Sequence, residues 1–314
     1  MKVLLTGATG FMGGSLAEYL NTNTPYELTC AVRRTARQKC HHTVLIDDLD
    51  SDTDWSSALA GQDVVIHAAA RAHIMKDEVL DPLVEYRRVN VDGTLNLAKQ
   101  AADAGVRRFI FISSIKVNGE QTPASQPFTA KDKPSPEDAY GISKMEAEKG
   151  LRALAAETGI DVVIIRPPLV YGPEVKGNFA SMIKLVEKGL PLPLGAIHNK
   201  RSLVALDNLV DLIITCIDHP DAANQTFLVS DGEDLSTTEL LQGVAEAIGK
   251  PSRLVPVPAG LLQFGASLLG KKAMAQRLLG SLQVDVRHTR EQLGWNPPLT
   301  VKEGLQRCFP DYQG

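Results

Sequence analysis

The stretch Lys2-Val3-Leu4-Leu5-Thr6-Gly7-Ala8-Thr9-Gly10-Phe11-Met12-Gly13-Gly14 decides the fold. A short apolar run ends in three glycines with the spacing GxxGxxG, and a helical pattern follows. Gly7 permits a tight turn, Gly10 lets the backbone approach a pyrophosphate, and Gly13 allows close helix–strand packing. The N-terminus of the following helix would present unpaired N–H groups to the phosphates. The stretch therefore predicts a dinucleotide-binding loop, with Phe11 and Met12 beside the cofactor.

Short apolar runs alternate with helical patterns through the first half of the chain. The runs are Val3–Leu5, Leu28–Val32, Val44–Ile46, Val64–Ala68, Phe109–Ser113 and Val162–Ile165. Helical patterns lie at about 12–21, 56–60, 78–104 and 137–158. This alternation predicts an α/β fold, a Rossmann-type doubly wound parallel sheet with helices on both faces.

The character of the sequence changes after Arg166, where prolines cluster and further helices are expected around 178–189, 208–217 and 237–248. Ser236 and Glu239 have capping-box spacing, and Asp207 is expected to cap the helix from Asn208. We predict a dinucleotide-binding domain at 1–165, completed by a strand near 226–229. Residues 166–314 would form a smaller, interleaved α/β substrate-binding part.

Composition excludes several other classes of protein. Among 314 residues, 33 are basic and 37 acidic, and a net charge of −4 gives no reason to expect nucleic acid or an anionic membrane surface as partner. The longest apolar stretches are too short for membrane insertion. The four cysteines, Cys30, Cys40, Cys216 and Cys308, stand far apart without metal-ligand spacing. We expect no metal, a reducing compartment and a cytoplasmic protein.

The end of the second predicted strand bears on the choice of cofactor. About twenty residues past the loop, an NAD site has Asp or Glu for the ribose 2′-hydroxyl, whereas this chain has Arg33-Arg34. An arginine there suits a 2′-phosphate, which favours NADP(H), with NAD(H) as the alternative. The two arginines could also be plain surface residues.

Tyr140 and Lys144 form a YxxxK motif at the start of a helical pattern, so both project from one face. A phenol has a pKa near 10, and a nearby ammonium favours its ionised form. YxxxK is common by chance on surface helices. The order of glycine loop, strand ending in Ser113-Ser114 and then YxxxK indicates an acid–base site instead.

These motifs resemble the extended short-chain dehydrogenase/reductase family, in its branch of nucleotide-sugar epimerases, dehydratases and reductases. The resemblance covers nearly the whole chain. It is carried by Thr6–Gly13, Val65-Ile66-His67-Ala68-Ala69-Ala70, Asn90–Thr94, Phe111–Ser114, Tyr140/Lys144, Arg166–Pro173 and Arg201–Asp207.

The resemblance implies a role for each matching residue. Tyr140 would be the acid/base, Lys144 would bind the nicotinamide ribose, and Ser114, rather than Ser113, would hydrogen-bond the reacting sugar oxygen. Asp48 before Leu49 would meet the adenine. Ala68, Ala69, Ala70 and Pro167 would also line the cofactor site. Asn178 and Arg201 would hold the nucleotide diphosphate, with Arg277 as a second candidate; Asn178 could instead cap a helix, and Arg277 could be a surface arginine.

Departures from the family pattern narrow the function. The 4,6-dehydratases place Asp-Glu directly after the serine position, whereas Ile115-Lys116 stands here. The sequence most resembles UDP-4-keto-6-deoxy-N-acetylhexosamine 4-reductases of O-antigen and cell-surface polysaccharide synthesis. A UDP-hexose 4-epimerase, acting on UDP-glucose or UDP-N-acetylglucosamine, is the alternative. A non-catalytic nucleotide-binding regulator is a third alternative, which the retention of Ser114, Tyr140 and Lys144 disfavours.

The expected partner is a UDP-sugar, and the family suggests a homodimer through helices near 85–104 and 140–157.

Overall fold

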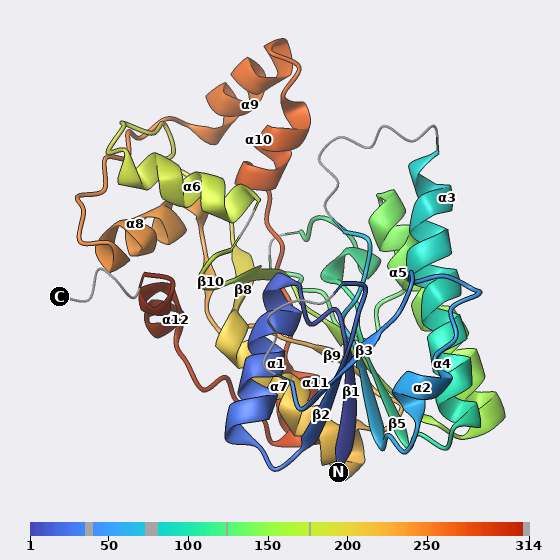
Figure 1. The fold of residues 1–314 in the computed structure, drawn as a ribbon. Coiled ribbons are helices and arrows are strands. Elements are labelled where there is room, and N and C mark those ends of the chain that lie inside the picture. Colours follow the sequence, from blue (N-terminus) through green and yellow to red (C-terminus); the bar gives the residue numbers. More distant parts are fainter. Residues whose placement is uncertain (35–39, 73–80, 124, 176, 310–314) are drawn as a thin grey trace.

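The computed structural model describes residues 1–34, 40–72, 81–123, 125–175 and 177–309. Most of the strands run together through the lower half of the molecule, and helices flank them (Figure 1). None of the described helices combines the length and the apolar character needed to cross a membrane.

A seven-stranded parallel sheet organises the molecule, in the order β3-β2-β1-β4-β5-β6-β9. Its strands are β1 (Lys2–Thr6), β2 (Glu27–Val32), β3 (His42–Leu45), β4 (Val64–His67), β5 (Arg108–Ile112), β6 (Asp161–Arg166) and β9 (Thr226–Leu228). Chain order reverses between β1 and β4, and a crevice at such a switch point is where doubly wound sheets bind nucleotides. The predicted doubly wound sheet is confirmed, and the run near 226–229 does join it.

Helices cover both faces of this sheet (Figure 1). On one face lie α1 (Phe11–Asn23), α7 (Leu206–Asp218) and α11 (Arg287–Leu293), whose Leu16, Leu209 and Leu293 share one buried cluster. The other face carries α2 (Ser56–Leu59), α3 (Pro82–Arg87), α4 (Gly93–Asp103) and α5 (Ala139–Thr158), with a short π-helix, Arg88–Asp92, joining α3 to α4. Leu97 and Leu151 pack into the second cluster there.

A second, three-stranded sheet has the order β10-β8-β7. Its strands are β7 (Leu169–Tyr171), β8 (Arg201–Ala205) and β10 (Asp234–Leu235). The helices around it are α6 (Asn178–Glu187), α8 (Thr237–Ala247), α9 (Ala259–Leu268), α10 (Lys272–Leu279) and α12 (Val301–Arg307). We predicted neither this sheet nor α9, α10, α11 and α12, because their short segments lack a clear period.

Two predicted helix caps have different outcomes. Ser236 and Glu239 form the predicted capping box at the start of α8. Asp207 does not cap α7, because the helix begins at Leu206, two residues before the expected start at Asn208, and Ala205 takes the cap position. Asp207 lies in the first turn instead, where its carboxylate accepts a hydrogen bond from Arg307 at 2.7 Å.

Cys30 and Cys40 form a disulfide, with their Cα atoms 6.2 Å apart. We expected four separate thiols from their wide spacing in the sequence. The parallel register of β2 and β3 pairs Cys30 with Thr43, so Cys40, two residues before the start of β3, is brought alongside. Cys216 is a free, buried thiol and Cys308 a free, half-buried one.

Candidate functional site

The glycine loop connects β1 to α1 through a tight turn at Gly7, which has a φ of +76°. A Cβ at Gly7 would lie 2.6 Å from the Ala69 nitrogen, and a Cβ at Gly13 would lie 2.2 Å from the Gly7 carbonyl oxygen. Both positions therefore exclude any side chain. Gly10 takes the cap position of α1, and no side chain caps the helix there. The first N–H groups of α1 thus face an open, exposed turn.

This geometry fits a dinucleotide. A pyrophosphate would satisfy the N–H groups that no side chain caps, in the favourable field of the helix N-terminus. The loop stands at the carboxyl end of β1, and the backbone N–H of Ala69, after β4, donates to the Thr6 Oγ1 at 3.3 Å. Ala68 and Ala69 therefore lie against the turn at Gly7, and Ala70 follows them in the chain. Phe11 and Met12 form the first turn of α1.

The ends of β2 and β3 bring together the residues assigned to the adenosine end. Arg33, 70% exposed, has its Nη1 3.6 Å from the Asp48 Oδ1. Arg88 also donates to the Asp48 Oδ2 at 3.2 Å. The backbone hydrogen bond from Leu49, together with Arg88 and Arg33, lowers the pKa of the Asp48 carboxyl despite partial burial. No acidic residue follows β2 directly, so Arg33 itself occupies that position.

The adjacent serines after β5 differ in their surroundings. The Ser113 hydroxyl is buried and donates to the Glu148 Oε1 at 2.6 Å. Ser114 is half-buried, and the one hydrogen bond of its hydroxyl among the described residues is a 3.3 Å bond accepted from the Lys116 backbone N–H. Ser113 therefore belongs to the interior, whereas Ser114 has the more available hydroxyl. Pro167, which follows β6, accepts a hydrogen bond from the Ile115 N–H at 3.0 Å and ties the two strand ends together.

Tyr140 and Lys144 lie one turn apart near the start of α5. The Lys144 Nζ is 6.0 Å from the centre of the Tyr140 ring and 4.3 Å from that of Phe111. Burial lowers the pKa of Lys144 to about 7, although Glu148 opposes the shift. Burial raises the pKa of Tyr140, and Asp138 and Tyr86 add to that shift. The phenol thus retains its proton at neutral pH unless more positive charge comes close.

Asp138 and Lys116 link the two segments that carry the predicted catalytic residues, and we did not predict this pair. Asp138 caps α5, accepting from the Gly141 N–H at 2.7 Å. Its other carboxylate oxygen accepts from the Lys116 Nζ, which also donates to Glu120 at 2.9 Å. Burial alone would raise the Asp138 pKa, but hydrogen bonds from Lys116 and Gly141 outweigh it and the pKa is lowered. The helix start at Tyr140 is thereby tied to the segment that carries Ser114.

Glu148, Arg166 and Asn118 form a buried network beneath the site. Arg166 donates to both carboxylate oxygens of Glu148, at 2.8 and 2.5 Å, and to the Asn118 Oδ1 at 2.8 Å. Asn118 in turn donates to the Thr129 carbonyl at 2.9 Å. Glu148 lies one turn beyond Lys144 on α5. Its spacing of four residues from Lys144 was the feature of the sequence that could have pointed to it. The sequence alone gave no role for Asn118; here it closes this network.

His67 stands at the end of β4 between two threonines. Its Nδ1 is 2.7 Å from the Thr6 Oγ1 and its Nε2 is 2.9 Å from the Thr94 Oγ1. Burial lowers the pKa of His67 to about 3, and the charge of Lys144 adds to the shift. The imidazole is neutral and fixes the end of β4 under the cofactor loop.

The residues assigned to the diphosphate lie on three different elements. Arg201, on β8, is mostly buried and donates to the Arg277 and Gly280 carbonyls at 3.0 and 3.1 Å. Burial lowers its pKa, while Glu120 opposes the shift. Arg277, on α10, is exposed, and its charge contributes to lowering the Asp138 pKa. Asn178 begins α6, with Gly177 at the cap position, and its side chain lies outside the described residues.

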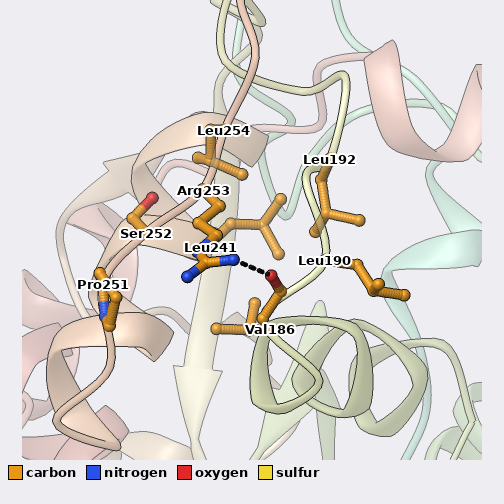
Figure 2. A pocket seen from close by; sticks show the side chains of 9 residues that line it. Val186, Leu190, Leu192, Leu241, Pro251, Ser252, Arg253 and Leu254 are labelled. Atoms are coloured by element: carbon orange, nitrogen blue, oxygen red, sulfur yellow. Dashed lines mark hydrogen bonds between the residues drawn. The ribbon is translucent and has the colours of Figure 1, made fainter.

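A small pocket between the end of α6 and residues 251–254 is a separate feature (Figure 2). Val186, Leu190, Leu192 and Leu241 give it an apolar lining, and Arg253 donates to the Gly189 carbonyl at 3.3 Å across it. None of the predicted catalytic side chains lines it.

Within the described part of the chain, no group of His, Cys, Asp and Glu side chains could hold a metal ion.

The glycine loop, the switch point and the Ser114/Tyr140/Lys144 arrangement define a nicotinamide-dependent enzyme on a Rossmann-type sheet. The model of the NAD dependent epimerase/dehydratase family matches residues 3–230, and the chain belongs to this family. It is 53% identical over 307 residues to a UDP-glucose 4-epimerase from Vibrio cholerae, a match that covers 98% of this chain and 94% of that protein.

Two solved structures share the fold. UDP-glucuronic acid 4-epimerase from Bacillus cereus in complex with NAD has a TM-score of 0.77 at 20% identity, covering 99% of this chain and 96% of that one. RMD from Pseudomonas aeruginosa complexed with NADPH has a TM-score of 0.76 at 22% identity, covering both chains fully. Members with this fold thus bind either nicotinamide cofactor. The expected membership of the extended short-chain dehydrogenase/reductase class is confirmed.

Proposed function

We propose that the protein is a UDP-hexose 4-epimerase. The 53% identity to the Vibrio cholerae UDP-glucose 4-epimerase, spread over 98% of the chain, carries this proposal. From the sequence alone we placed a 4-ketoreductase first and a 4-epimerase second. The identity favours the epimerase. Ile115 and Lys116, which follow Ser114, also suit epimerisation or ketone reduction better than an elimination, which needs an additional acid–base pair there. Ile115 is apolar, and Lys116 is paired with Asp138 and Glu120.

The roles we assign rest on the positions of the side chains. Ser114 would hydrogen-bond the C4 oxygen, while Tyr140 would take the C4 hydroxyl proton and later return it. Lys144, close to the Tyr140 ring, would favour the phenolate and hold the nicotinamide ribose. Arg201, together with Asn178 or Arg277, would hold the diphosphate of a UDP-sugar.

The chain would hold a nicotinamide cofactor at the loop, and this cofactor would supply reversible hydride transfer at C4 of the sugar. The chain would bind its pyrophosphate at Gly7, Gly10 and Gly13, with Ala68, Ala69, Ala70 and Pro167 lining the ring end. Asp48 and Leu49 would meet the adenine. Because burial and Asp138 raise the Tyr140 pKa, proton removal depends on positive charge supplied beside the phenol.

Arg33 supports the second candidate, net reduction of a UDP-4-keto sugar with NADP(H). It occupies the position at which an acidic residue would accept from the ribose 2′-hydroxyl, and it is 70% exposed. A 2′-phosphate would meet its guanidinium with charge-assisted hydrogen bonds. We therefore propose that the site accepts NADP(H), with NAD(H) as the alternative. The reaction proposed first does not depend on which of the two is bound.

The test is the cofactor balance of the purified full-length protein. Supplied with UDP-glucose, it should form UDP-galactose with no net oxidation or reduction of nicotinamide. Chromatography measures the UDP-sugars, and absorbance measures the nicotinamide in the same reaction. Tyr140→Phe is the control and should lose about 10²–10⁴-fold in rate while keeping cofactor affinity. Consumption of one NADPH for each UDP-4-keto sugar, without interconversion of UDP-hexoses, would establish the reductase instead.

The assembly that we propose follows from the family resemblance. A homodimer would form through α3, α4 and α5, which pack against one another on one face of the sheet. We also propose that the protein works in the cytoplasm, where UDP-sugars would reach it.

A further inference from the structure

Helix α9 presents an apolar stripe to solvent. Leu261, Phe264 and Leu268 follow one another at spacings of three and four, so they share a face. They are 64%, 65% and 73% exposed, Leu269 beyond the helix is 73% exposed, and none of the α9 residues is buried. Large apolar side chains gathered on one face of a water-soluble protein mark an interaction surface.

The segment around this stripe has an unusual distribution of charge. Residues 247–284 contain no Asp or Glu, although the whole chain has more acidic than basic residues. They contain five basic residues: Lys250, Arg253, Lys271, Lys272 and Arg277. Lys271 and Lys272 are exposed and stand directly beyond the apolar stripe. Neither Lys271 nor Lys272 forms an ion pair with a described carboxylate, whereas the charge of Arg277 acts on Asp138. The net charge of the chain conceals this local positive region.

The helical hairpin that carries the stripe is fixed to the body at its base. Gly270, with a φ of +66°, reverses the chain between α9 and α10. At the far end of α10, the Leu278 carbonyl accepts from Thr237 at 2.5 Å and the Gly280 carbonyl accepts from Asn199 at 2.8 Å. Figure 1 shows α9 and α10 at the end of the molecule opposite to the N-terminus. The stripe is thus held outward on an anchored support.

We propose that α9 and the Leu269–Lys272 turn dock this protein on the surface of an anionic phospholipid bilayer. Apolar side chains flanked by lysines are the pattern of interfacial helices, which bury the apolar face at the headgroup boundary while the lysines meet anionic lipid. The exposed Lys271 and Lys272 beside the stripe favour this occupant over a second copy of the chain, because two copies of the same face would repel each other. The docking is peripheral and leaves the chain outside the bilayer.

The experiment is co-sedimentation of the full-length protein with vesicles of phosphatidylglycerol and phosphatidylcholine, compared with phosphatidylcholine alone. We expect binding at least tenfold stronger to the anionic vesicles in low salt, and weaker binding in 0.5 M salt because the charges are screened. Phe264→Glu/Leu268→Glu and Lys271→Glu/Lys272→Glu should each reduce binding at least tenfold. The matched controls are Leu45→Glu, at a leucine 62% exposed on β3, and Lys2→Glu/Lys302→Glu, and both should bind as wild type.

Epimerase activity on soluble UDP-glucose separates this proposal from the proposed function. The α9 variants should keep wild-type activity in the absence of vesicles, because none of the changed residues lies in the assigned site. Equal sedimentation of wild type and the α9 variants, or no binding to anionic vesicles, would overturn the docking surface. So would a dimer that Phe264→Glu/Leu268→Glu converts to a monomer without any vesicle binding, since the stripe would then be an interface between chains.

Discussion

Lys144 donates a hydrogen bond from its Nζ to the carbonyl oxygen of Ile112, 2.8 Å away, at the end of β5. This contact holds a buried ammonium beside the Tyr140 ring at the edge of the sheet. Burial lowers the Lys144 pKa to about 7, whereas an unfolded lysine has a pKa of about 10.4. The residue assigned to catalysis therefore destabilises the fold that contains it.

Replacing Lys144 with Met should stabilise the protein without cofactor while abolishing turnover. Between pH 7 and about pH 10 the unfolded chain binds more protons at this lysine than the folded one, so wild-type stability rises with pH over that range. The variant should exceed wild type by at least about 1 kcal/mol at pH 7, and this advantage should shrink by up to about 1.4 kcal/mol per unit toward pH 10. Urea denaturation at several pH values measures it. A variant less stable than wild type at pH 7 would contradict the argument.

Ser113 and Ser114 should separate stability from catalysis. Ser113→Ala leaves a buried Glu148 oxygen short of a donor, so we expect a loss of about 1–3 kcal/mol in unfolding free energy with kcat little changed. Ser114→Ala should lower kcat by about 10²-fold or more, because a donor to the sugar oxygen disappears. Its free energy of unfolding should fall by less than about 1 kcal/mol. The two variants are each other's control, and the reverse pattern would exchange the two assignments.

Arg33→Asp should shift cofactor preference from NADP(H) toward NAD(H). The change removes the partner of a 2′-phosphate and supplies an acceptor for a 2′-hydroxyl. Because charge-assisted hydrogen bonds contribute about 1.5–3 kcal/mol, the ratio of the two affinities should move tenfold or more. Arg34→Asp, with the same charge change one residue further on, should move it less. If wild type already binds NAD(H) more tightly, Arg33 is a plain surface residue.

His67 should make the fold sensitive to mild acid. Its folded pKa of about 3 lies below its unfolded value, so the stability of the neutral form is complete above about pH 6.5 and falls as pH drops toward 3. Between pH 7 and pH 5 this group should remove about 2 kcal/mol. His67→Gln should be less stable at pH 7, because its contacts with Thr6 and Thr94 change, but its stability should fall less between these pH values. Equal acid sensitivity in both proteins would exclude His67 as the cause.

Local pattern was enough to predict the nucleotide-binding sheet, because each strand and the turn at Gly7 are specified by neighbouring residues. It did not predict β7, β8 and β10, which are two to five residues long and exist through pairings between distant segments. The Lys116–Asp138 pair and the Cys30–Cys40 disulfide were missed for the same reason, since each joins residues ten or more positions apart. The positive charge of residues 247–284 could be read from the sequence. We considered only the net charge of the whole chain, in which this local excess does not show.

The pairing of β9 with β6 has a consequence for synthesis on the ribosome. A nascent chain that has emerged as far as Arg166 can pair six strands, but the outer edge of β6 must wait for Thr226–Leu228. Until then an apolar strand edge, with Ile164 and Ile165, stays open, and such an edge invites pairing with other chains. Of the helices that cover one face of this sheet, α7 also follows Arg166, and α11 emerges only after β9. The first half of this protein should therefore depend on chaperones until its second half arrives, and a fragment ending at Arg166 should aggregate.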